Sequence, residues 1–213
     1  MRRNLRRLLL GTIAVVAAGN LVILAAFLVS RLTEQAPNLA IDGIDNVRMV
    51  DGKLLRGDAP SAEGYRGLAE REVSTVVDLR AERDLVVPSA VLDELGIERV
   101  HIPMRDGQTP DVAQSSRFLD VVRQAEGRVF VHCGAGVGRT GVMAAAYLVE
   151  EGETSRWEAL SRNLSVGPPS LEQIVYTASL KGDGKAQQQP PTWVQSLSRI
   201  FDGPRRIWSA LRA

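Results

Sequence analysis

The hydrophobic pattern is most extreme near the amino terminus, where residues 8–30 form 23 consecutive positions without a charged side chain. As a helix this stretch would be about 34 Å long, against a bilayer hydrocarbon core of about 30 Å. Four arginines precede it, whereas Arg31 and Glu34 after it nearly cancel. The positive-inside rule then predicts a single-pass membrane anchor over residues 1–31, with a cytoplasmic amino terminus and the rest of the chain exported.

A cleavable signal peptide is the alternative, because Ala17, Ala18 and Gly19 provide a small-residue cleavage site after a short apolar region. The apolar run continues to Val29, however, which is further than a cleaved signal requires. We therefore favour an uncleaved anchor. A short stalk is predicted to follow it over residues 32–46, where a proline and turn-forming dipeptides interrupt any periodicity.

The middle of the chain, residues 47–180, alternates between the two-residue period of strands and the longer period of helices. We predict a hairpin at 47–56, strands at 73–79, 97–102 and 128–132, and helices at 61–72, 88–95, 111–126, 139–151, 155–164 and 170–180. This alternation predicts one α/β domain with a central, mostly parallel sheet flanked by helices. Ligands of such sheets bind beyond the carboxyl ends of the strands.

The carboxyl-terminal end combines apolar and basic residues again. After a polar linker at residues 181–192, apolar side chains recur at helical spacing through residues 193–213, with four arginines between them. This pattern predicts an amphipathic basic tail whose apolar stripe lies in the membrane interface, packs back on the domain or stays unpacked. Membrane lipid is thus the expected partner of residues 8–30 and a candidate partner of the tail.

Charge is distributed unevenly along the chain. The net charge is +1, but residues 1–30 carry +4 and residues 193–213 carry +3, which leaves −6 for residues 31–192. An acidic folded part argues against a nucleic-acid partner, since nucleic-acid-binding domains present a basic face. Cys133 is the single cysteine, so an internal disulfide is excluded, and with only two histidines we expect neither a metal site nor a cofactor.

The segment richest in chemistry is residues 129–141, with the sequence VFVHCGAGVGRTG. A strand delivers Cys133 to its carboxyl end, five small or apolar residues follow, and Arg139 opens a helix. Glycines allow the backbone N–H groups to point inward, and the helix amino terminus adds further N–H groups. Such a cradle favours thiolate over thiol, and the Arg139 guanidinium matches two phosphate oxygens. The simplest chemistry is attack of the Cys133 thiolate on a bound phosphoryl group, which gives a cysteinyl-phosphate intermediate.

The H-C-x5-R-T sequence from His132 to Thr140 resembles the signature of the cysteine-dependent protein tyrosine and dual-specificity phosphatases. The resemblance extends over roughly residues 47–180 and implies that Cys133 is the nucleophile and that Arg139 binds phosphate. It also implies that Thr140 hydrogen-bonds the sulfur, while His132 orients the loop rather than acting as a base. The loop positions that would supply backbone N–H groups to the phosphate are Gly134, Ala135, Gly136, Val137 and Gly138.

The family also uses a general acid on a loop upstream of the cysteine. Residues 103–110 form this loop in the present chain, and Asp106 is the candidate acid. Asp111 is explained instead as the cap of the next helix, through its D-x-x-Q pattern. Gln173 stands where some relatives place a water-positioning glutamine, although Ser170 to Gln173 is also a plain capping box, which is the interpretation we favour.

Two further segments carry the resemblance. Residues 55–60 look like the family's early R-x-x-x-P element, and Asp78-Leu79-Arg80 looks like the D-L-R sequence that closes an early strand in compact bacterial and atypical dual-specificity members. We interpret Asp78 and Arg80 as an ion pair at the end of a buried strand rather than as substrate contacts. His101, at the end of the strand before the acid loop, is likewise interpreted as a structural histidine.

The resemblance leaves the substrate open. We favour a phosphotyrosine or phosphoserine/threonine protein, because Gly134 and Val137 stand where phosphoinositide phosphatases of similar signature often carry lysine. An inositol phosphate is the alternative, since phytase-like cysteine phosphatases have a similar A-G-x-G-R-T loop. A catalytically inactive phosphate-binding module is the third interpretation, and the presence of Cys133, Arg139 and Asp106 argues against it.

Overall fold

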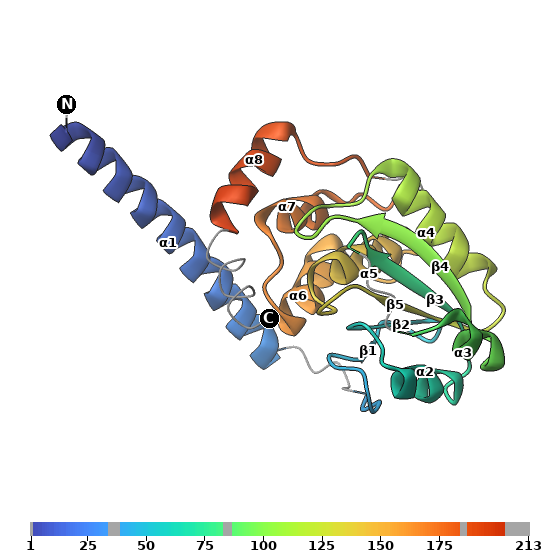
Figure 1. The fold of residues 1–213 in the computed structure, drawn as a ribbon. Helices are drawn as coiled ribbons and strands as arrows, with labels where there is room; N and C mark the ends of the chain where they lie inside the picture. Colours follow the sequence, from blue (N-terminus) through green and yellow to red (C-terminus); the bar gives the residue numbers. More distant parts are fainter. Residues whose placement is uncertain (1, 34–38, 83–86, 184–186, 203–213) are drawn as a thin grey trace.

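The computed structural model describes residues 2–33, 39–82, 87–183 and 187–202 (Figure 1). A five-stranded sheet with the order β1-β2-β5-β3-β4 forms its centre. The strands are β1 (Arg48–Met49), β2 (Leu54–Gly57), β3 (Val73–Arg80), β4 (Glu98–Met104) and β5 (Arg128–His132). β1 is antiparallel to β2, and the other neighbouring strands are parallel, which confirms the mostly parallel sheet predicted from the sequence.

Helices cover both faces of this sheet (Figure 1). They are α1 (Arg2–Thr33), α2 (Ala62–Ala69), α3 (Ser89–Glu94), α4 (Val112–Gln124), α5 (Gly138–Glu150), α6 (Arg156–Val166), α7 (Leu171–Ser179) and α8 (Thr192–Phe201). On β5, Phe130 belongs to the core under α2 and α3, whereas Val129 and Val131 belong to the core under α4 and α5. Successive side chains of a strand point to opposite faces, so this apolar run is buried on both sides.

The strand register brings three loop-forming ends together. Gly57 at the end of β2 and Asp78 near the end of β3 both lie opposite His132 at the end of β5. The segments that follow these strands therefore begin at the same edge of the sheet. This edge carries Cys133, directly after β5.

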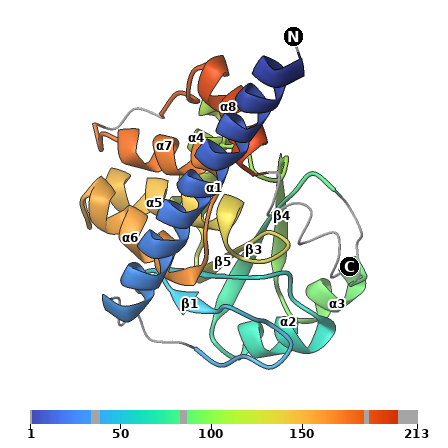
Figure 2. The same cartoon turned by 90° about the vertical axis from the view of Figure 1, so that its left-hand side faces the viewer.

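The helix α1 is continuous and lies along α6, with its middle close to α8 (Figure 2). Val16, Asn20, Ile23 and Phe27 recur on its less exposed face at helical spacing. The Asn20 amide donates to the carbonyl of Phe201 at 3.1 Å, which satisfies the polar side chain within the apolar stretch. Over Leu9–Thr33 the helix has a mean hydropathy of 2.5 and is long enough to cross a membrane, properties that a signal sequence also has.

The structure differs from the stalk predicted for residues 32–46. Ile41 and Ile44 are buried, form an isolated bridge with each other, and pack in the core under α2. Residues 39–46 are therefore part of the folded domain. The two isoleucines stand among turn-forming residues, so no regular period revealed that their side chains are buried.

The carboxyl-terminal segment also packs on the domain in part. The helix expected in the tail is present as α8, and Val194 and Ser198 on one of its faces are buried. Trp193 and Ile200 are exposed on α8. Of the tail predicted over 193–213, residues 203–213 lie outside the described residues.

Candidate active site

The loop between β5 and α5 is held from outside by its carbonyl groups. The carbonyl of Gly134 accepts from the N–H of Ala59 at 3.4 Å, and the carbonyl of Ala135 accepts from the Asn46 amide at 3.2 Å. None of the N–H groups of residues 134–137 donates to another described residue. The loop thus keeps backbone donors available for an anion, as the sequence pattern predicts.

Arg56 on β2 is the main support of this loop, a role that the local sequence pattern did not reveal. Its Nη2 donates to the carbonyls of Gly136 at 2.7 Å and Val137 at 3.2 Å, and to the Asn163 side chain at 3.2 Å. Burial lowers the pKa of Arg56 to about 10, so the guanidinium stays charged at neutral pH. The signal in the sequence was the R-x-x-x-P element, but the partners of Arg56 lie 80 to 107 positions away.

Gly136 explains why the loop has to carry a glycine at its centre. Its φ is +68°, a conformation that other residues rarely adopt. A Cβ at this position would also stand 2.5 Å from the carbonyl carbon of Gly57, at the end of β2. The loop therefore approaches the neighbouring strand too closely for any side chain.

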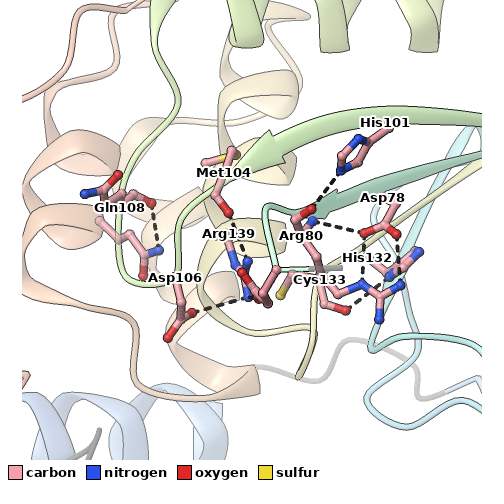
Figure 3. A network of polar contacts seen from close by, with 11 residues as sticks. Asp78, Arg80, His101, Met104, Asp106, Gln108, His132, Cys133 and Arg139 are labelled. Carbon is pink, nitrogen blue, oxygen red and sulfur yellow. Dashed lines mark hydrogen bonds and ion pairs between the residues drawn. The ribbon is translucent and has the colours of Figure 1, made fainter. Parts of the chain in front are cut away.

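Arg139 is buried at the first turn of α5 and faces the acid loop (Figure 3). Its Nη1 donates to the carbonyl of Met104 at 3.0 Å, and its Nη2 lies 2.5 Å from Glu82 Oε1 and 3.5 Å from Asp106 Oδ1. Burial by itself raises the pKa of Glu82, but the bond from Arg139, a backbone hydrogen bond and the charges of Arg139 and Arg80 together hold that pKa below its ordinary value. Glu82 is thus a site residue that the sequence analysis did not single out.

Asp106 lies on the loop after β4, as the sequence predicts, and its side chain is 64% exposed. Gln173 reaches the same loop from α7, because its Nε2 donates to the carbonyl of Gln108 at 3.0 Å. The expected capping boxes of Ser170 with Gln173 and of Asp111 with Gln114 are both present. Gln173 also lies close to the start of α5, because a Cβ added to Gly138 would stand only 2.7 Å from its Oε1. It thus contacts both the acid loop and the first residue of α5.

His132 is fully buried behind the loop, and its Nδ1 lies 3.1 Å from the carbonyl of Cys133. Asp78 and Arg80 form the expected strand-end ion pair, with Arg80 Nη2 2.9 Å from Asp78 Oδ2. His101 Nε2 lies 2.7 Å from the carbonyl of Arg80, which agrees with a structural role for this histidine. The first contact lies at the end of β5 that carries Cys133, and the other two join the ends of β3 and β4 beside it (Figure 3).

Thr140 is also buried, but its hydroxyl has no hydrogen-bond partner in the described part of the chain. The bond to the Cys133 sulfur that the resemblance implies is therefore not formed in this arrangement. Among the described residues, no three His, Cys, Asp or Glu side chains gather into a group that could hold a metal ion.

Burial of His132 predicts a pH dependence of stability. Burial lowers its pKa from 6.5 to about 4, so between these values the unfolded chain binds the proton more tightly. The neutral ring stabilises the fold fully above the unfolded pKa, and this contribution is lost as the pH falls toward 4. From about pH 7.5 to about pH 5, the free energy of unfolding should fall by about 2 kcal/mol more in the wild type than in His132→Gln. Urea titrations at both pH values measure this difference, and equal losses in the two proteins would contradict it.

The fold and the loop define a class of proteins, the phosphatases with a cysteine nucleophile in a phosphate-binding loop. A family model described as "DSP-PTPase phosphatase fused to NAD+ Kinase" matches residues 39–182, and the chain belongs to this family. The human dual specificity protein phosphatase CDC14C is 35% identical over 97 residues. That alignment covers 43% of this chain and 22% of CDC14C, so the chain spans less than a quarter of this relative.

Two solved structures share the fold. TpbA of P. aeruginosa is 23% identical with a TM-score of 0.59, and the match covers 72% of this chain and 95% of TpbA. The core catalytic domain of the PP-IP phosphatase SIW14 from S. cerevisiae is 16% identical with a TM-score of 0.58, covering 75% of this chain and 94% of that domain. At sequence identities of 23% and 16%, these similarities show a shared fold and nothing about substrates.

Proposed function

We propose that the protein hydrolyses phosphomonoesters through a cysteinyl-phosphate intermediate. The observation that supports this proposal is the shared edge where Cys133, Arg139 and the free N–H groups of the loop meet. In the structure, Arg139 Nη2 lies 2.5 Å from Glu82 Oε1, and a bound phosphate would replace Glu82 as the partner of this guanidinium. The buried guanidinium would then neutralise the charge on the phosphoryl oxygens in the transition state.

The reaction proceeds in two displacement steps. The Cys133 thiolate attacks phosphorus, the S–P bond forms and the bond to the leaving oxygen breaks, while Asp106 donates a proton to that oxygen. Asp106 then accepts a proton from a water molecule, whose oxygen attacks phosphorus and releases the thiolate and inorganic phosphate. The position of Asp106 Oδ1, 3.5 Å from Arg139 Nη2, supports this role because it places the carboxyl beside the phosphate site.

The preferred substrate in this proposal is a phosphorylated protein. Gly134 and Val137 bring no positive charge to the loop, and Arg139 is flanked by the acidic Glu82 and Asp106, which disfavours a highly charged inositol phosphate. The relatives point to both classes, because CDC14C is named a protein phosphatase and SIW14 a PP-IP phosphatase.

A substrate panel tests this choice. The 213-residue chain in detergent micelles should show a kcat/KM at least about tenfold higher for phosphotyrosine or phosphoserine/threonine peptides than for inositol phosphates. The reverse order would assign the protein to the inositol-phosphate class. Binding of phosphopeptides without turnover of any substrate would favour a phosphate-binding module instead.

We also propose that α1 anchors the protein in a membrane, with the amino terminus in the cytoplasm and the domain exported, and that α1 separates from α6 and α8 when it spans the bilayer. Leu21, Leu28 and Val29 on the outward side of α1 are at least half exposed, so described residues leave this apolar face uncovered. Trp193 and Ile200 on α8 and Trp157 on α6 add exposed apolar side chains that suit a membrane interface.

Reporter fusions test the proposed orientation. An alkaline phosphatase reporter fused after residue 45 should be active, and a reporter that requires the cytoplasm should be inactive at the same position. The opposite result would place the domain in the cytoplasm. A reporter released into the soluble fraction would indicate a cleaved signal peptide.

A further inference from the structure

Residues 187–202 lie beyond the matched family region, yet they pack against the acid loop. We call residues 187–202 the strap. The Gln189 side chain donates to the carbonyl of Thr109 at 2.8 Å, which places one end of the strap three residues from Asp106. The strap continues into α8, which runs beside α7 (Figure 1).

Glu172 links the strap to the same threonine from the other side. Its Oε1 accepts from both the N–H and the hydroxyl of Thr109, each at 3.0 Å, although Glu172 is only 3% exposed. The N–H of Glu172 in turn donates to the Ser198 hydroxyl at 3.0 Å, and Ser198 is 1% exposed. Buried polar groups of this kind hold one geometry, because any other leaves them without hydrogen bonds.

The two contacts bind both backbone groups of Thr109. Its N–H is bound by Glu172 of α7 and its carbonyl by Gln189 of the strap, so the acid loop cannot shift at this residue without breaking one bond to each. The strap also lines a cavity next to the candidate acid. Asp106, Glu82 and Arg199 line a cavity of about 620 Å³ together with other side chains of the loop, α7 and α8.

We propose that the strap is a positioning element of the active site. Through Gln189 directly, and through Ser198 and Glu172, it fixes Thr109 and thereby sets where the Asp106 carboxyl stands relative to Arg139 and the leaving oxygen. This inference rests on the proposed function, in which Asp106 is the general acid. Without the strap contacts, residues 103–110 are still present, but the Asp106 carboxyl lies within proton-transfer distance of the leaving oxygen for a smaller fraction of the time.

The test uses the dependence of rate on the leaving group. A positioned acid matters for a poor leaving group such as phenol and matters little for p-nitrophenol, which leaves readily as the anion. In the 213-residue chain, Gln189→Ala combined with Ser198→Ala should lower kcat/KM for phenyl phosphate about tenfold, while kcat/KM for p-nitrophenyl phosphate changes less than about twofold. We compare kcat/KM because it reports the step in which the leaving oxygen departs, whereas kcat also contains the later hydrolysis step that both substrates share. The neighbouring variant Gln188→Ala is the matched control and should leave both rates unchanged, because the Gln188 side chain is exposed.

Asp106→Asn provides the reference for this test. It should show the same selectivity with a larger loss on phenyl phosphate, about 100-fold, and the strap substitutions should add nothing in its background. Equal losses on both substrates, or no loss, in the strap variant would overturn the inference, provided that Asp106→Asn behaves as expected. An Asp106→Asn protein without leaving-group selectivity would refute the acid assignment itself. If the double variant does not fold, Gln189→Ala alone should give the same selectivity to a smaller extent, since its bond lies near the surface.

Discussion

Replacing Cys133 with serine will abolish turnover, with kcat on p-nitrophenyl phosphate reduced by at least about 10⁴-fold. A serine hydroxyl stays protonated at neutral pH, so it cannot attack phosphorus as the thiolate does. The side chain is buried at the end of β5, and serine differs from cysteine by one atom, so the loop should keep its shape. Steady-state kinetics and trapping of a phosphorylated protein by rapid acid quench measure the loss.

The phosphate site should survive this substitution. The loop N–H groups and Arg139 are unchanged in Cys133→Ser. The affinity of a phosphotyrosine peptide for Cys133→Ser should therefore lie within about tenfold of its affinity for the wild type, measured under conditions without turnover. Residual hydrolysis above a few per cent in Cys133→Ser would contradict a cysteine nucleophile.

Arg139→Lys should lower kcat/KM by about 10³-fold, which is the second largest effect we expect. The guanidinium of Arg139 bonds to the Met104 carbonyl through Nη1 while its Nη2 faces Glu82 and Asp106. A lysine ammonium is a single point donor on a shorter reach, so it cannot hold Met104 and bind two phosphate oxygens at once. The loss should appear in kcat as well as in KM, because the contact strengthens in the transition state.

Arg123→Lys is the matched control for Arg139→Lys. Arg123 pairs with Glu151 at 2.8 Å on the surface between α4 and the end of α5. Its replacement should change kcat/KM less than about twofold. A comparable loss in both variants would show that the effect of Arg139→Lys reflects stability rather than phosphate binding.

The interactions that the sequence predicts correctly are those between residues close together in the chain. Cys133 and Arg139 stand at the two ends of one loop, and the capping box of Asp111 with Gln114 spans three positions. The parallel sheet followed from the alternation of strand and helix periods, which is also a local property. In each case the backbone geometry of a few residues determines the outcome.

The contacts that complete the candidate site join distant parts of the chain. Arg56 holds Gly136 across 80 positions, and Gln189 holds Thr109 across 80 positions. Glu82 reaches Arg139 from the charged cluster after β3, where nothing in the local pattern distinguishes it from its charged neighbours. The sequence offers many possible partners for the side chains of Arg56, Gln189 and Glu82. The packing of the helices and strands determines which of these partners each side chain contacts.

The amino-acid sequence by itself therefore determined the α/β architecture, the glycine-rich loop between Cys133 and Arg139, and the apolar helix at the amino terminus. Only the tertiary structure decided that residues 39–46 and the strap belong to the folded domain, and that Arg56, Glu82 and Glu172 surround the site. The physical reason is that a period or a loop motif is set by neighbouring residues, whereas a buried contact depends on which surfaces the whole chain brings together as it excludes water.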